Sequence, residues 1–312
     1  MISEAGPLPG AETVSFRTAR RALILLATRN GEAWLDEQLR SIFEQRDVLV
    51  SIAASDDGST DGTRRTLRKW ARLKPLGLLP GQAPLGGAAR NFLHLIREAP
   101  LEDASFVAFA DQDDIWEPTK ITRAIEFIER FGLDAYSSDV TAFWPDGTRR
   151  RIRKAQPLRK HDHLFESAGP GCTFVFTRVA FLRLRAWVTE NSGRLLNPPI
   201  HDWLIYAYAR THGWKWHIDD WTSVQYRQHA RNEIGANAGL VAAGRRLQRV
   251  RSGAFRSDVL AVADAVDDSS WVAEAMRRLW IRDRLALLCR AGDLRRRPRD
   301  RWLLALLLLL MR

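Results

Sequence analysis

The chain has 312 residues, 46% of them hydrophobic, and a formal net charge of +11 that is carried almost entirely by arginine. A chain of this length and apolar content can bury a full core, which allows one large α/β domain with an appendage or two modest domains. Its two cysteines, Cys172 and Cys289, exclude a disulfide framework and a cysteine-based metal knuckle, so we expect two buried, reduced thiols in a cytosolic protein.

Neither a leader nor a membrane span is predicted. Residues 1–18 contain proline, glycine and two glutamates without an apolar core, so they do not resemble a signal peptide and are predicted to form a flexible tail. The longest apolar run, residues 302–311, is about half of the roughly 20 residues that a bilayer span requires. These features predict a cytoplasmic location.

The first 130 or so residues alternate between apolar runs and segments with helical spacing. Continuous apolar runs predict buried parallel strands at residues 22–28, 47–54 and 105–110. Apolar residues at helical spacing predict helices at residues 33–45, 63–73 and 91–96 and a fourth after Pro118. This alternation predicts an α/β fold with an open, mostly parallel sheet and helices on both faces.

The pattern changes after Arg150. The elements predicted beyond it are a strand at residues 171–177, helices at 179–189 and 204–209, an extended segment at 214–228, and arginine-rich helices from residue 239 onward. No internal repeat is present.

Positive charge is concentrated in two segments. Residues 149–160, predicted to be a loop, hold seven arginines and lysines and no acid, and residues 237–312 hold sixteen arginines against eight acids, a net +8. A composition bias of the source genome would explain the preference for arginine over lysine but not this clustering. Because the catalytic candidates lie mostly outside both segments, we expect the basic residues on partner-facing surfaces.

Polar clusters follow each of the three N-terminal strands, at residues 28–30, 55–59 and 111–114. In open α/β sheets, ligands bind at the carboxyl ends of the strands. Three strands that deliver polar groups to one edge therefore predict a single ligand site there.

The third cluster contains Asp111, Asp113 and Asp114. Three carboxylates this close repel one another unless a cation lies among them. Carboxylate ligands completed by phosphate oxygens suit Mg²⁺ or Mn²⁺. The alternative is that Asp113 or Asp114 caps the helix after Pro118, which would explain one acid and not three.

The second cluster has the sequence SDDGSTDG at residues 55–62. Asp61 or Thr60 is expected to cap the following helix, but two further acids precede it. Asp56 or Asp57 could accept a hydrogen bond from the N3–H of a pyrimidine base.

Four segments together resemble glycosyltransferase family 2. They are LLATRNGEAWLDEQLRSIFEQ, SDDGSTDGT, GGAARN at residues 86–91 and FADQDDIW. The resemblance covers about the first 130 residues and implies a GT-A fold, a Rossmann-like, mostly parallel sheet flanked by helices. The implied domain spans residues 19–236, and residues 237–312 form an Arg-rich helical C-terminal extension.

The resemblance also implies roles for individual residues. The residues implied to contact the nucleotide are Thr28, Asn30, Asp56 or Asp57, Arg90 and Asp111. Asp111 would face the ribose or the metal, and Asp113 would bind the metal that bridges the diphosphate.

The segment His201-Asp202-Trp203 precedes an apolar helix. By default Asp202 would be an N-cap, but the segment resembles the site of the family's catalytic base, which deprotonates the acceptor hydroxyl during direct displacement with inversion. Together with the downstream YRQHARNEIGAN, it most resembles the bacterial rhamnosyltransferase branch, whose donor is dTDP-L-rhamnose. A UDP-sugar is the alternative donor.

Four further residues are candidates for the same site. Trp203 and Gly171 are expected on the acceptor side, with Gly171 leaving room for the acceptor. Arg227 is a candidate for bidentate phosphate binding. His229 is a candidate metal or diphosphate ligand, or else a surface histidine.

The basic C-terminal segment has two explanations. Its arginines, interleaved with Trp271, Trp280 and Trp302, would suit an anionic membrane surface, such as the inner face of a bacterial plasma membrane. Alternatively, the segment is a helical layer that packs on the catalytic domain or on a second subunit, giving a homodimer.

The resulting hypothesis is an inverting glycosyltransferase that acts on a glycan or lipid-linked glycan acceptor in bacterial cell-surface polysaccharide synthesis. A family member that uses another UDP- or GDP-hexose is the closest alternative. A nucleotidyltransferase would need a Gly-rich triphosphate loop, which residues 29–32 lack. A basic nucleic-acid-binding protein is the non-enzymatic alternative, but the chain contains no recognised recognition module, and we expect no nucleic-acid partner.

Overall fold

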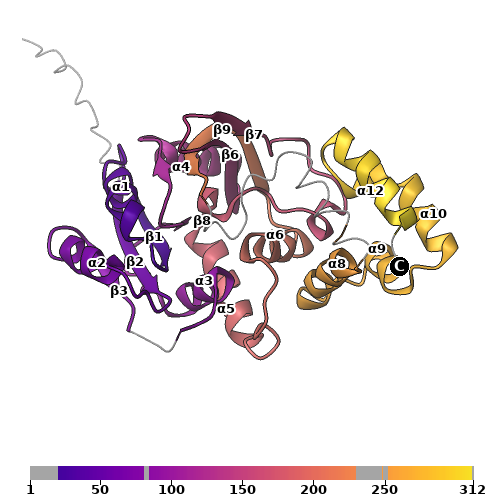
Figure 1. Ribbon diagram of the computed structural model, residues 1–312, viewed down its shortest axis with the longest axis horizontal. Coiled ribbons are helices and arrows are strands. Elements are labelled where there is room, and N and C mark those ends of the chain that lie inside the picture. Colours follow the sequence, from indigo (N-terminus) through magenta and orange to yellow (C-terminus); the bar gives the residue numbers. More distant parts are fainter. Residues whose placement is uncertain (1–19, 81–83, 230–247, 249–251, 311–312) are drawn as a thin grey trace, which may run out of the picture.

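The structure is a computed structural model that describes residues 20–80, 84–229, 248 and 252–310. The predicted tail at residues 1–18 lies outside these residues. The described strands form a nine-stranded mixed sheet in the order β3-β2-β1-β4-β8-β6-β9-β5, with β7 paired to β6. Helices cover both faces of this sheet (Figure 1), as the sequence predicted.

The N-terminal half follows the predicted alternation. Its strands are β1 (Arg21–Thr28), β2 (Leu49–Asp56), β3 (Leu76–Leu78) and β4 (Phe106–Ala110), and its helices are α1 (Glu32–Phe43), α2 (Thr63–Ala71), α3 (Ala88–Glu98) and α4 (Lys120–Phe131). The strands β1, β2 and β4 are parallel neighbours, with Thr28 opposite Asp56 and Leu26 opposite Ala110. Their carboxyl ends therefore lie at one edge, which confirms the predicted meeting of the polar clusters.

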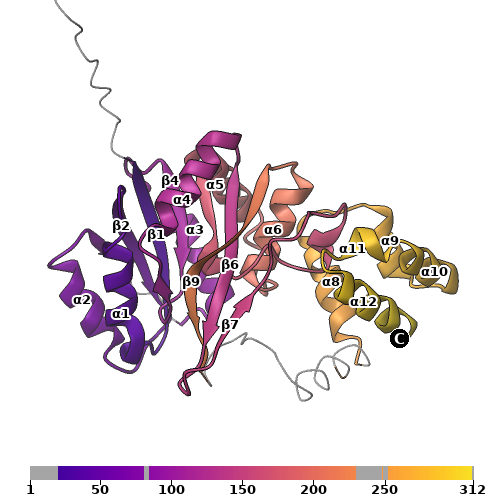
Figure 2. The same cartoon turned by 90° about the horizontal axis from the view of Figure 1, so that it is seen from above.

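The second half of the chain adds antiparallel strands, so the sheet is mixed. Its strands are β5 (Ile115–Trp116), β6 (Ala135–Phe143), β7 (Arg149–Ile152), β8 (Val175–Thr177) and β9 (Trp216–Arg227). Strand β8 is antiparallel to β4 and β6, while β6 is parallel to β9. Figure 2 shows β6, β7 and β9 running together in the middle of the molecule.

The short strands β3 and β5 and the longer strands β6 and β7 were not predicted. Strand β6 contains Ser137, Ser138 and Asp139, all fully buried, which interrupt any apolar pattern. Strand β7 lies within residues 149–160, which were predicted to be a loop. Its sequence, RRRI, lacks the alternation of apolar and polar residues that identifies a strand. It is antiparallel to β6, and the Arg151 guanidinium pairs with the Asp139 carboxylate at 2.8 Å.

The helix caps suggested by the sequence are not formed as expected. Helix α2 has Gly62 at its N-cap, rather than Asp61 or Thr60. Helix α4 begins after Thr119, so neither Asp113 nor Asp114 caps it. Helix α6 (His201–Thr211) has Ile200 at its N-cap, which leaves Asp202 inside the first turn. The predicted strand at residues 171–177 begins instead with a 3-10 turn, η2 (Gly171–Thr173), and the chain then forms β8 and α5 (Arg178–Glu190).

The C-terminal region is helical, as predicted, and lies at the opposite end of the molecule from α1 and α2 (Figures 1 and 2). Its described helices are α8 (Ala254–Ala265), α9 (Trp271–Arg278), α10 (Ile281–Cys289), α11 (Ala291–Leu294) and α12 (Pro298–Leu310). They share a hydrophobic core with Leu164, the last residue of the 3-10 turn η1 (Asp162–Leu164), and with Phe165, which follows it. The region is therefore packed on the catalytic half of the chain.

The structure also tests the expectations for the two cysteines and for a membrane span. Cys172 is buried, but Cys289 at the end of α10 is exposed, so the expectation of two buried thiols is wrong for Cys289. Among the described residues, no helix combines the length and apolar character needed to cross a membrane.

Candidate active site

A cavity of about 1340 Å³ opens at the carboxyl ends of β1, β2 and β4. Its walls come from these strand ends, the first turns of α3 and α6, strand β7 and the connection between α11 and α12. The predicted site residues that line it are Thr28, Asp57, Arg90, Asp111, Asp113, Gly171, Asp202 and Trp203. Asn30, Asp56, Arg227 and His229 are not among its lining residues.

Asp56 and Asp57, although adjacent, have different environments. The Asp56 carboxylate accepts hydrogen bonds from Thr28 Oγ1 at 3.1 Å and from Arg64 Nε at 2.5 Å, which ties β2 to α2. Asp57 reaches the cavity wall, and its carboxylate accepts the backbone N–H groups of Gly86 at 3.1 Å and Gly87 at 2.9 Å. Both glycines have positive φ, +89° and +139°, which favours glycine over residues with a Cβ. Asp57 therefore holds the glycine segment against the cavity.

Asn30 and Arg90 also differ in position. The Asn30 side chain accepts the Thr60 N–H at 2.8 Å and so fastens the β1–α1 turn to the β2–α2 turn. Arg90 lies in the first turn of α3, where its guanidinium donates to the Leu85 carbonyl at 3.1 Å and to the side chain of Asn197. Of these two residues, Arg90 lines the cavity and Asn30 does not.

The acidic cluster divides into two pairs, the first of which is Asp113 with His229. Asp113 Oδ2 lies 2.8 Å from His229 Nε2, and the imidazole stacks on Trp34 with ring centroids 3.9 Å apart. The His229 side chain is 12% exposed and lies between Asp113 and Trp34, so it is not a free surface side chain. A carboxylate and an imidazole are ligand types that suit Mn²⁺ or Mg²⁺, and Asp111 lies on the wall of the same cavity as Asp113.

The second pair is Asp114 with Cys172, both fully buried. Burial and the neighbouring Asp113 and Asp111 raise the pKa of Asp114 well above its usual value, and burial raises the pKa of the Cys172 thiol. Lys120 lies behind them, 3.5 Å over the Trp116 ring, and burial lowers its pKa to about 7. Ligand atoms of Asp111, Asp114 and Cys172 come within 4.8 Å of one another. A thiol is a soft ligand, and a hard cation such as Mg²⁺ prefers oxygen ligands.

Arg227 is directed away from the cavity. Its guanidinium donates to the Asp113 carbonyl at 2.8 Å, pairs with Glu37 and lies 4.6 Å over the Phe143 ring. These contacts brace the acidic cluster from behind, so the structure does not support the expected phosphate contact.

Asp202 lies on the cavity wall in the first turn of α6. Burial raises the pKa of its carboxyl to about 6, while the nearby Lys154 and the backbone N–H groups of Trp203 and Gly171 act in the opposite direction. A carboxylate whose pKa lies close to neutral pH can accept a proton from a bound hydroxyl and release it later.

Gly171 makes room for protein rather than for an acceptor. A Cβ at this position would meet His201 Nε2 at 2.5 Å and Asp202 Cβ at 3.5 Å. The His201 ring fills that space, stacked on Phe92 with centroids 4.1 Å apart, and burial lowers its pKa to about 3. Gly171 therefore lets the first turn of α6 approach η2 and brings Asp202 to the cavity.

Most of the cavity wall near Asp202 was not predicted from the sequence. The basic residues that line the cavity there are Arg150, Arg151, Arg153, Lys154, Arg295, Arg297 and Arg299. They come from the two basic segments, which were expected on partner-facing surfaces, and the structure places these seven residues on the cavity wall. The clustering of charge was the available signal, but nothing in the sequence links residue 150 to residue 297.

Comparisons with known proteins identify the family of this chain. The family model described as Glycosyl transferase family 2 matches residues 23–187. The dTDP-rhamnosyl transferase RfbG of Shigella flexneri is 38% identical over 287 residues, which cover 91% of this chain and 99% of that protein.

Solved structures show the same fold at low sequence identity. S. aureus TarS 1–349 in complex with UDP superposes with a TM-score of 0.52 at 15% identity, covering 83% of this chain and 91% of that one. The complex of the same protein with UDP-GlcNAc gives a TM-score of 0.53 at 14% identity, covering 88% and 80%.

Proposed function

Because this chain belongs to glycosyltransferase family 2, we propose that it is an inverting transferase in which Asp202 is the catalytic base. The observation that carries this proposal is the position of Asp202, a carboxylate with a pKa of about 6 that lines the same cavity as Asp57 and Asp113. The acceptor hydroxyl gives its proton to Asp202 while its oxygen attacks the anomeric carbon. The bond from that carbon to the diphosphate breaks, and the nucleoside diphosphate leaves with its electron pair.

The donor would lie along the strand ends. Asp57, together with Thr28 and Arg90, would contact the nucleotide, and Asp111 would face its ribose or the cation. Asp111, Asp113 and His229 would hold Mg²⁺ or Mn²⁺, which supplies positive charge to the departing diphosphate. Asp56 and Asn30 would shape this pocket by holding its loops, rather than by touching the nucleotide.

The proposed donor is dTDP-L-rhamnose. This choice is supported by the 38% identity to a dTDP-rhamnosyl transferase over nearly its whole length. The test is donor hydrolysis by the full-length protein with Mn²⁺, comparing dTDP-L-rhamnose with UDP-glucose, UDP-N-acetylglucosamine and GDP-mannose. We expect the rhamnose donor to be cleaved fastest. A faster UDP- or GDP-hexose would refute the rhamnose assignment and leave the transferase assignment standing.

The proposed acceptor is a glycan or lipid-linked glycan of cell-surface polysaccharide synthesis, with its anionic part on the basic wall. Four residues with cationic side chains from residues 150–154 and three from residues 295–299 line that wall, against the carboxylates of Glu166, Asp202 and Asp300. The apolar side chains of Phe255, Leu303 and Leu307 lie on the same wall. A basic wall with an adjoining apolar rim suits an acceptor that carries phosphate and an apolar chain.

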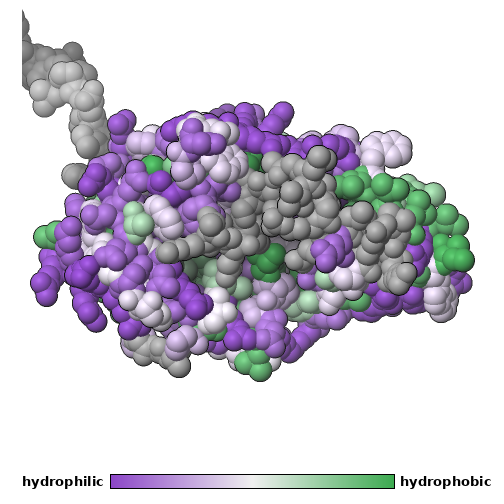
Figure 3. Space-filling view, in the orientation of Figure 1, coloured by the Kyte–Doolittle hydropathy of each residue, from purple (hydrophilic) through white to green (hydrophobic). Residues whose placement is uncertain are grey.

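We further propose that α10 and α12 rest on an anionic membrane surface. Figure 3 shows a hydrophobic patch at the end of the molecule where these helices lie. Its exposed large side chains are Trp280, Ile281, Leu285, Trp302, Leu303, Leu306 and Leu309. Arg282 lies 4.5 Å over the Trp280 ring and Arg278 5.8 Å over it, so positive charge accompanies the patch, as binding to anionic lipid requires.

Vesicle sedimentation tests this surface. Trp302, which is 80% exposed, is replaced by glutamate, and the matched control is Leu73→Glu, an exposed apolar residue far from the patch. We expect wild type and Leu73→Glu to sediment with phosphatidylglycerol vesicles and Trp302→Glu to remain in the supernatant. Equal sedimentation of all three, or a concentration-dependent dimer that Trp302→Glu abolishes, would refute the membrane assignment.

A further inference from the structure

Arg296, in the connection between α11 and α12, is a buried arginine that links the C-terminal region to the catalytic half. Its side chain is 0% exposed, and its guanidinium lies 3.1 Å from Asp162 Oδ2 and 3.3 Å from Glu166 Oε2. Its backbone N–H also donates to Glu166 Oε1 at 2.7 Å. Buried charges are tolerated when they are paired in this way, and removing one partner leaves the others uncompensated.

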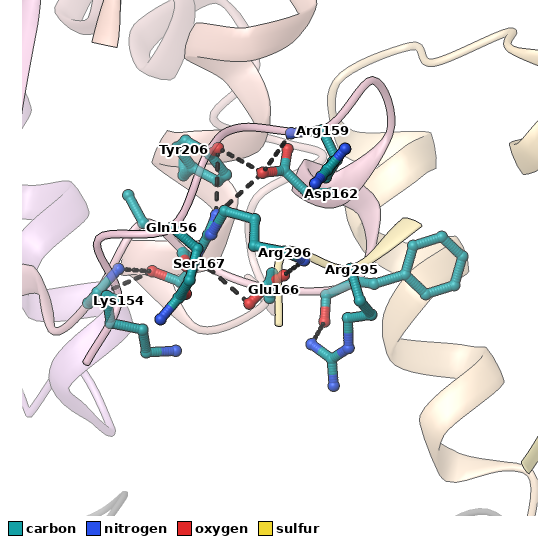
Figure 4. Close-up of polar contacts among 12 residues, drawn as sticks. Lys154, Gln156, Arg159, Asp162, Glu166, Ser167, Tyr206, Arg295 and Arg296 are labelled. Carbon is teal, nitrogen blue, oxygen red and sulfur yellow. Dashed lines mark hydrogen bonds and ion pairs between the residues drawn. The ribbon is translucent and has the colours of Figure 1, made fainter. Parts of the chain in front are cut away.

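The same guanidinium contacts the helix that carries Asp202. Tyr206, on α6, accepts a hydrogen bond from Arg296 Nη1 at 3.2 Å and donates one to Asp162 Oδ2 at 3.1 Å. Arg210, one turn further on, donates to Tyr206 at 2.7 Å and to Asp162 at 2.7 Å. Figure 4 shows Arg296, Asp162, Tyr206 and Glu166 converging. We call Arg296, Asp162, Glu166, Tyr206 and Arg210 the Arg296 cluster.

The spacing along α6 connects this cluster to the proposed base. Residues 202, 206 and 210 are four apart, so their side chains lie along one face of the helix. The cluster therefore holds α6 through the two turns that follow Asp202.

A second connection runs through residues 161–167. The Arg296 guanidinium also donates to the Ser167 carbonyl, and Arg295 donates to the Phe165 carbonyl at 2.6 Å. From the same segment, the His163 carbonyl accepts the Trp203 indole N–H at 2.7 Å. Trp203 adjoins Asp202 in the chain, so the C-terminal region restrains the first turn of α6 from two directions.

We propose that Arg296 is a positioning residue for Asp202, and that the C-terminal region is thereby part of the catalytic machinery rather than an independent attachment. This inference rests on the proposed function, because it takes Asp202 as the base. The donor side of the cavity, formed by Asp57 and Arg90, makes none of the contacts of the Arg296 cluster. A displacement of α6 should therefore slow transfer without weakening donor binding, since a shift of 1 Å in a catalytic group can cost on the order of 10²-fold in rate.

The test uses two full-length variants and a matched control. Tyr206→Phe removes one hydroxyl from the cluster, and Arg296→Lys keeps the charge but loses the guanidinium fork. The control is Arg256→Lys, because Arg256 donates to the carbonyls of Met276 and Arg277 within the C-terminal region alone. We expect kcat to fall about 10-fold in Tyr206→Phe and about 10²-fold in Arg296→Lys, with donor KM unchanged in both and Arg256→Lys at the wild-type rate.

A purely structural role would give a different result. If the cluster acts through Asp202, adding Tyr206→Phe to Asp202→Asn changes the residual rate by less than about twofold, because the two changes then remove the same contribution. A full 10-fold loss in that background, or wild-type kcat in Tyr206→Phe alone, overturns the inference. Tyr206→Phe decides the question even if Arg296→Lys fails to fold. Wild-type transfer by Asp202→Asn would instead refute the proposed function.

Discussion

Replacing Asp202 with asparagine is expected to lower kcat by about 10² to 10⁴-fold, the usual contribution of a positioned general base. Asparagine keeps the size of the side chain but cannot accept the proton of the acceptor hydroxyl. Donor affinity should stay within about twofold of wild type, because the nucleotide would bind to Asp57 and Arg90 and not to α6. The measurement is steady-state transfer, with nucleoside diphosphate affinity followed by calorimetry.

The matched control is Asp103→Asn, because Asp103 is exposed, pairs with Arg21 at 3.1 Å and does not line the cavity. It should transfer at close to the wild-type rate. The pH profile adds an independent check. The pKa of Asp202 is raised to about 6, so the carboxylate is ionised and active above that pH and protonated below it. We expect kcat/KM to fall as the pH drops below about 6 and to be level above it. A profile without this acid limb, or full activity in Asp202→Asn, would contradict the assignment.

Replacing Asp113 with asparagine is expected to raise the half-saturating Mn²⁺ concentration at least about tenfold, since even the partners behind a metal ligand contribute 10- to 100-fold to affinity. Asp113 is the carboxylate that lies 2.8 Å from His229 and also lines the cavity. Asparagine would leave the imidazole in place and remove the negative charge. Transfer measured across a Mn²⁺ titration reports both the affinity and the rate at saturation.

Asp114→Asn separates two candidate cation sites. Asp114 is fully buried and does not line the cavity, and burial and its acidic neighbours raise the pKa of its carboxyl, so we expect it to lie outside the cation site. The half-saturating Mn²⁺ concentration should therefore match wild type. If Asp114→Asn weakens Mn²⁺ more than Asp113→Asn does, the cation would lie instead among Asp111, Asp114 and Cys172.

The N-terminal half of the site could be predicted because its signals are local. An apolar run such as residues 22–28 makes a parallel strand, and the residues that follow it must emerge at the carboxyl edge. The placement of Thr28, Asp57, Arg90, Asp111 and Asp113 around one cavity followed from that rule together with the family resemblance. The choice between Asp56 and Asp57 did not, because adjacent residues point in different directions and only the neighbouring loops decide which one faces the cavity.

The strands β6 and β7 could not be predicted for a different reason. Buried serines and an aspartate in β6 are stabilised by partners that are distant in sequence, such as Ser223 for Ser138 and Arg151 for Asp139. A polar residue that is satisfied by such a partner looks like a loop residue until the partner is known. The arginines of β7 were for the same reason assigned to a loop, and the structure places Arg150 and Arg151 on the cavity wall.

By itself, the sequence determined the α/β architecture of the first half, the meeting of its polar clusters at one edge and the candidacy of Asp202, because each depends on periodicity or on a short motif. Only the tertiary structure decided what surrounds Asp202. Residues 295–299 lie far along the chain from residues 150–154 and 161–167, and buried ion pairs such as Arg296–Asp162 bring these segments together at the cavity. The Asp111–Asp114 segment illustrates both parts of this result. Its acidity is evident from the sequence, but the division into an Asp113–His229 pair and a fully buried Asp114 beside Cys172 arises from partners more than fifty residues away.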